Sequence, residues 1–127
     1  MREFDQRFED YMRGHTNETS RWMHVAGMAA AVGVAVTAVG RRRARLLWGV
    51  PAAFFGFAWS GHFVFEKNKP VGFTDPVAAF SGDLMMIYLM ATGRNAELVA
   101  LLERLRERDA VAGPCAADGR RPAPQAA

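Results

Sequence analysis

Two long stretches without a formal charge constrain the fold of this chain more than any other feature. They run from Trp22 to Gly40 and from Leu46 to Phe65, with 19 and 20 residues. An apolar helix of about 20 residues crosses the hydrocarbon core of a bilayer. The basic run from Arg41 to Arg45 that joins them is typical of a loop at a membrane surface. The sequence therefore predicts an antiparallel transmembrane hairpin, and a buried hairpin of a soluble protein is the alternative.

Small residues recur at every fourth position of both stretches, a spacing that favours close helix packing in lipid. They are Ala29, Gly33 and Thr37 in the first stretch and Ala52, Gly56 and Ser60 in the second. We expect the two helices to pack through these stripes. Pro51 is compatible with a helix only in its opening turn.

Helical patterns also fill most of the remaining chain. Between Arg2 and Arg13 the apolar residues follow one face of an amphipathic helix, at Phe4, Phe8, Tyr11 and Met12. Asp75 and Pro76 are typical of a helix start. The apolar segment that follows, 76–93, is predicted to be a third span or a re-entrant helix, interrupted near Ser81 and Gly82.

A second amphipathic helix is predicted from Asn95 to Asp109, with leucines on one face. The fold class expected is thus all-α, a small integral-membrane helical bundle built on the hairpin, with amphipathic terminal helices. It forms a single helical membrane domain over residues 1–109. The composition of residues 110–127 predicts a disordered tail.

Charge and cysteine content exclude several classes of function. The net charge is +3 and the pI about 9.6, but the arginines outside the Arg41–Arg45 run are scattered or lie beside acids. No nucleic-acid-binding motif is present, so nucleic acid is not an expected partner. The one cysteine, Cys115, excludes an internal disulfide and a CxxC site for zinc or redox chemistry.

The three histidines of the chain are predicted to meet at one end of the hairpin. His24 precedes the basic turn by roughly 25 Å of helix and His62 follows it by roughly 24 Å, at about 1.5 Å per residue. His15, just before the first apolar helix, can fold over the same end. Glu66 lies four residues after His62 and shares its helix face. Imidazole and carboxylate together suit iron, manganese or zinc, and Asp83 is a further ligand or supports a histidine.

Three other interpretations of these residues stay open at this point. His24 and His62 suit the axial positions of a b-haem electron carrier, which a Soret band would reveal. In a noncatalytic membrane protein the histidines would only cap helix ends and bind no stoichiometric metal. The same ligand types are also compatible with a zinc-dependent lipid hydrolase.

Two blocks of the sequence resemble the signatures of the Mpo-type 2-hydroxy-fatty-acid dioxygenases. They extend from His15 to Gly27 and from Phe57 to Pro70. The likeness covers roughly residues 4–94, and its later part is similar to the bacterial branch at Pro76, Gly82-Asp83, Met86 and Thr92-Gly93-Arg94. The family usually has an asparagine where this chain has Ser20.

This resemblance implies an iron(II)-dependent oxidoreductase in the membrane, the inner membrane in a bacterium. Such an enzyme uses molecular oxygen to shorten 2-hydroxy fatty acids by one carbon, the step of fatty-acid alpha-oxidation. The expected catalytic and metal-binding residues are His15, His24, His62 and Glu66, supported by Asn17, Ser20 and Asp83. From position alone, three basic residues are predicted to attract the substrate carboxylate, namely Arg21, Lys67 and Lys69.

Overall fold

The computed structural model describes residues 2–113. The five α-helices in this range are α1 (Arg2–Arg13), α2 (Glu18–Gly40), α3 (Gly49–Ser60), α4 (Pro76–Ala91) and α5 (Asn95–Ala112). Three short segments complete the path: the 3-10 helices η1 (Ala44–Trp48) and η3 (Val71–Phe73), and the π-helix η2 (Gly61–Glu66). No strand occurs within these residues, so the all-α prediction is confirmed.

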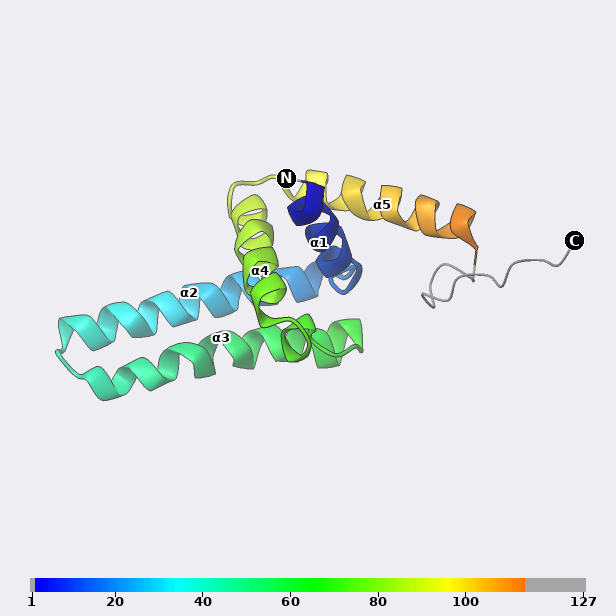
Figure 1. The fold of residues 1–127 in the computed structure, drawn as a ribbon. Helices are drawn as coiled ribbons and strands as arrows, with labels where there is room; N and C mark the ends of the chain where they lie inside the picture. Colours follow the sequence, from blue (N-terminus) through cyan, green and yellow to red (C-terminus); the bar gives the residue numbers. More distant parts are fainter. Residues whose placement is uncertain (1, 114–127) are drawn as a thin grey trace, which may run out of the picture.

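Helices α2 and α3 form an antiparallel hairpin around the arginine turn (Figure 1). Pro51 lies in the first turn of α3, as predicted, where its missing N–H disrupts no helical hydrogen bond. Among the helices described, α2 alone is long and apolar enough to cross a membrane. The second apolar stretch is divided among η1, α3 and η2 instead of forming one continuous α-helix.

The hairpin packs through small residues other than the predicted ones. Both predicted stripes are exposed, and Cβ atoms added at Gly33 and Gly56 would meet open space. The closest approaches are instead at Gly27, where a Cβ would lie 2.9 Å from the Phe54 carbonyl oxygen, and at Gly61, where it would lie 3.0 Å from Ser20 Oγ. The tightest helix contact is therefore on the face that carries the two helical histidines.

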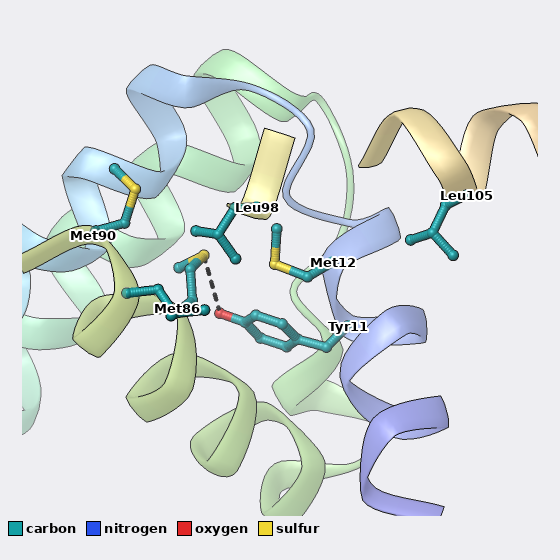
Figure 2. Packing of buried hydrophobic residues seen from close by; sticks show 7 residues of the cluster. Tyr11, Met12, Met86, Met90, Leu98 and Leu105 are labelled. Atoms are coloured by element: carbon teal, nitrogen blue, oxygen red, sulfur yellow. Dashed lines mark hydrogen bonds between the residues drawn. The ribbon is translucent and has the colours of Figure 1, made fainter. Parts of the chain in front are cut away.

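Helices α1, α4 and α5 pack together at the open end of the hairpin, and we call these three helices the cap (Figure 1). Their apolar faces meet in the core shown in Figure 2, built from Tyr11, Met12, Met86, Leu89, Met90, Leu98 and Leu105. The predicted stripe of α1 is confirmed for its second half, since Tyr11 and Met12 are buried. Phe8 packs against this core, whereas Phe4 is exposed.

Helix α4 begins as predicted, because the Asp75 side chain accepts a hydrogen bond from the Ala78 backbone N–H at 2.9 Å. The predicted interruption near Ser81 and Gly82 is wrong. Ser81 Oγ donates to backbone carbonyls of the preceding turn, and Gly82 lies against the Tyr11 ring. With 16 residues, α4 is short for a membrane span of about 20.

Helix α5 is three residues longer than the predicted helix, which ends at Asp109. It continues to Ala112, and Arg13 and Asp109 form an ion pair between α1 and α5. The rest of the predicted disordered tail, residues 114–127, lies outside the described residues.

Candidate metal centre

The three histidines meet where the cap joins the hairpin. His15 comes from the loop between α1 and α2, His24 from α2 and His62 from η2. They are 1%, 1% and 3% exposed, and they offer ligand nitrogens that all lie within 4.8 Å of one another. The predicted convergence of every histidine at one end of the hairpin is confirmed.

Each imidazole is held by a hydrogen bond at Nδ1. The partners are the Tyr11 carbonyl at 2.8 Å for His15, the Ser20 carbonyl at 2.9 Å for His24 and Asn68 Oδ1 at 2.8 Å for His62. Because all three partners are oxygen acceptors, Nδ1 carries the hydrogen and Nε2 keeps its lone pair. Metal-binding histidines usually have such an outer partner on the ring nitrogen opposite the metal.

The surroundings of the rings fit a bound cation. The buried Nε2 atom of His15 has no hydrogen-bond partner among the residues described, which is unfavourable unless a ligand occupies that position. Burial, and then the neighbouring His24, hold the pKa of His15 well below its usual value. The ring is therefore neutral at pH 7, the form that binds a metal.

A small chamber beside the three rings limits what they can hold. Its volume is about 40 Å³, and Tyr11 and Asp83 also line it. Since one water molecule takes about 30 Å³ in the liquid, the chamber accommodates an ion with a small ligand. A porphyrin ring does not fit, which argues against the haem interpretation.

Tyr11 and Asp83 form a polar pair next to the histidines. The Tyr11 hydroxyl donates to Asp83 Oδ1, and the Tyr11 ring stacks on His15 with centroids 4.0 Å apart. Asp83 Oδ1 lies 3.7 Å from His24 Nε2. Burial raises the pKa of Asp83 to about 6, and burial together with Asp83 raises the pKa of Tyr11 well above its usual value. The predicted place of Asp83 beside the histidines is thus observed.

Glu66 is not brought into the histidine group. Its Oε1 accepts from the Asn17 backbone N–H at 2.7 Å and its Oε2 from Thr16 Oγ1 at 2.9 Å. The predicted shared face assumed an α-helix, but residues 61–66 form a π-helix, whose i→i+5 hydrogen bonds change the register of Glu66 relative to His62. In the structure Glu66 therefore ties the end of η2 to the loop that carries His15.

Comparison with known proteins places these residues in a family. A family model described as 2-hydroxy-palmitic acid dioxygenase Mpo1-like matches residues 1–95, which include the whole candidate centre. The chain belongs to the Mpo1-like family. No curated protein and no solved structure matches the chain.

Arg21 of this Mpo1-like chain is buried instead of available to a substrate. Its guanidinium donates to the backbone carbonyls of His15 at 3.0 Å and Thr16 at 3.1 Å, and to Asn95 Oδ1 at 3.3 Å. The structure therefore assigns Arg21 to fixing the His15 loop against α5, in place of the predicted contact with the substrate carboxylate.

Of the supporting residues predicted from the sequence, Asn17 acts through its side chain and Ser20 through its backbone. Asn17 caps α2 by accepting from the backbone N–H groups of Thr19 and Ser20. Ser20 supports His24 through its carbonyl oxygen, so the usual asparagine of the Mpo1-like family is not needed for that bond. A small residue suits this position because Gly61 approaches it closely.

Two residues of the centre, Tyr11 and Asn68, were not predicted from the sequence. No local pattern in the sequence indicates the role of Asn68. Its position depends on the left-handed backbone of Lys67, with φ of 54°, which ends η2. Its amide bridges two elements, because Oδ1 bonds to His62 and Nδ2 donates to the Gly14 carbonyl at 3.0 Å. Lys67 and Lys69, by contrast, are exposed on this loop.

Proposed function

We propose that this chain is a metal-dependent dioxygenase acting on 2-hydroxy fatty acids, with iron(II) held by His15, His24 and His62. The observation that carries the proposal is the buried cluster of three imidazoles, each with Nδ1 engaged and Nε2 available. The family match supports the substrate class and the use of oxygen. Imidazole nitrogen suits iron, and three protein ligands leave coordination positions for other molecules. Bound iron(II) supplies the activation of molecular oxygen for shortening the acid by one carbon.

The residues around the histidines position these ligands and keep bulk water out. Glu66 and Arg21 fix the loop that carries His15, and Asn68 fixes the ring of His62. Tyr11 covers His15 from the cap side and directs its hydroxyl to Asp83. Asp83 is the acidic group on the metal side of the histidines, since its Oδ1 lies 3.7 Å from His24 Nε2; we assign it to that side of the centre, as a further ligand or as a group that holds another ligand in place.

We also propose that the hairpin is inserted in a lipid bilayer. Away from the cap, the hairpin exposes large apolar side chains: Val36 is 66% exposed, Val39 73% and Trp48 83%. Exposed apolar side chains gathered on one part of a molecule are typical of a membrane or interaction site. The arginines of the turn then lie at head groups, where basic residues are favoured. The cap and the metal centre lie at the other end of α2, near the opposite membrane face.

The proposed reaction is tested with detergent-purified, anaerobically handled protein and 2-hydroxypalmitate. We expect oxygen uptake and a fatty acid one carbon shorter with iron(II), and neither with zinc. The His62→Ala variant should lose both. Lipid hydrolysis with zinc and no oxygen uptake with iron would contradict the proposal and favour the hydrolase.

The exposed lysines are tested in the same assay. Charge-neutral replacement of Lys67 and Lys69 should raise the KM for the acid if they attract its carboxylate. An unchanged KM would remove this role.

A further inference from the structure

An apolar groove lies next to the metal centre, between the hairpin and the segment formed by η3 and α4. Its volume is about 380 Å³, within the usual size of small-molecule sites. Aliphatic and aromatic side chains form most of its wall, and among the described residues Asp83 is the one charged residue that lines it. The groove therefore has one polar point on an otherwise apolar surface.

The groove adjoins the chamber of the histidines. Phe54, Trp59, Gly72 and Asp83 belong to the walls of both. Val50 also lines the groove and precedes His62 by 12 residues, which corresponds to roughly 18 Å of helix. The groove thus extends from beside the polar chamber along the hairpin towards the arginine turn.

The rim of the groove is open on the apolar side of the molecule. Phe55, Phe73 and Phe80 line it and are all exposed. If the hairpin lies in the bilayer, these rings face lipid tails, and a hydrocarbon chain can enter sideways without crossing water.

We infer that this groove holds the hydrocarbon chain of the substrate, with the polar head at the Asp83 end and the chain directed towards Val50. The inference rests on the proposed function for the identity of the head group. An apolar site that extends along the hairpin and has a single polar end matches a single-chain amphiphile. A compact polar substrate would leave the half of the groove near Val50 without a partner.

Trp59 provides a direct probe of occupancy, because it lines the groove whereas Trp22 and Trp48 do not. In metal-free protein carrying Trp22→Phe and Trp48→Phe, a 2-hydroxy fatty acid brominated in mid-chain should quench Trp59 fluorescence saturably. Quenching that rises linearly with the concentration of the acid, as expected for a brominated detergent that binds no site, would overturn the inference.

A matched pair of glycine variants tests the position of the chain. A Cβ at Gly72 would be 3.7 Å from the Ala79 Cβ within the groove wall, and one at Gly56 would point into open space outside it. In the single-tryptophan protein, Gly72→Leu should weaken saturable quenching about tenfold, a free-energy change of about 1.4 kcal/mol. Gly56→Leu should leave it unchanged. Equal affinity in the two variants would overturn the inference.

Enzyme turnover, measured as oxygen uptake, distinguishes an error in the assignment of the groove from an error in the proposed function. Val50→Trp should shift the preferred acyl chain to a shorter length while the metal content stays unchanged. Quenching that depends on Gly72 without any oxygen uptake would support the groove and contradict the dioxygenase. The converse result is oxygen uptake together with fluorescence quenching and an acyl-chain preference that these variants do not change. It would support the dioxygenase and overturn the assignment of the groove to the acyl chain.

Discussion

Replacing Gly82 by alanine tests the packing of Tyr11 over the metal centre. A Cβ at this position would lie 2.5 Å from two carbons of the Tyr11 ring, well inside van der Waals contact. Tyr11 is 2% exposed and its ring stacks on His15, so the ring cannot move away without disturbing the metal centre. The substitution must therefore displace either the ring or α4, and with it the hydrogen bond to Asp83.

The magnitude follows from three contributions. Overpacking of a core costs about 1–3 kcal/mol, and loss of a hydrogen bond to a charged group costs about 1.5–3 kcal/mol. The better helix propensity of alanine offsets about 1 kcal/mol of this destabilisation. Gly82→Ala should therefore lower the free energy of unfolding by about 1.5–5 kcal/mol. The matched control, Gly56→Ala in α3, meets no neighbouring atom and should gain up to about 1 kcal/mol.

Thermal unfolding in detergent, followed by circular dichroism, measures the difference between the two variants. At a few degrees per kcal/mol, Gly82→Ala should reduce Tm by on the order of 10 °C. It should also reduce metal retention, because Tyr11 stacks on His15. A Tm for Gly82→Ala equal to or above that of Gly56→Ala would refute the packing argument.

Three further predictions concern the metal centre itself. Asn68→Ala removes the outer partner of His62 and should weaken metal affinity about 10–100-fold in a chelator competition; an unchanged affinity would contradict the support role. Glu66→Gln should keep its metal in elemental analysis, because Glu66 accepts hydrogen bonds from the His15 loop; loss of the metal would return Glu66 to the ligand set. Since the pKa of His15 is lowered, protons compete weakly for this ligand. On acid titration the metal should remain bound as the pH falls through about 6.5, the ordinary pKa of histidine, and should dissociate only at lower pH. Release of half of the metal at or above about pH 6.5 would contradict the lowered pKa of His15.

The histidine cluster could be predicted because it depends on a constant of helix geometry. The fixed rise of an α-helix sets the depth of His24 and His62 on either side of the turn, whatever the details of packing. The helix start at Asp75 was equally local, since capping involves neighbouring residues only. Predictions that depend only on the helix rise or on local capping were therefore correct.

Predictions that depend on which face meets which partner were less successful. Small residues occur on two faces of the hairpin, and periodicity did not distinguish Gly33 from Gly27 as the point of close approach. The π-helix that changes the register of Glu66 has no clear sequence signature. Tyr11 and Asp83 are 72 positions apart, and their pairing follows from how the cap folds over the hairpin.

Metal analysis of anaerobically purified protein tests the central claim most directly. We expect about one iron per chain in the wild type, as one three-histidine site requires. Separate His15→Ala, His24→Ala and His62→Ala variants should each lose the metal while retaining the helical circular dichroism spectrum. Iron that remains after these substitutions, or a wild-type protein that binds no metal when supplied with iron(II), would contradict the assignment of the buried histidines as a metal centre.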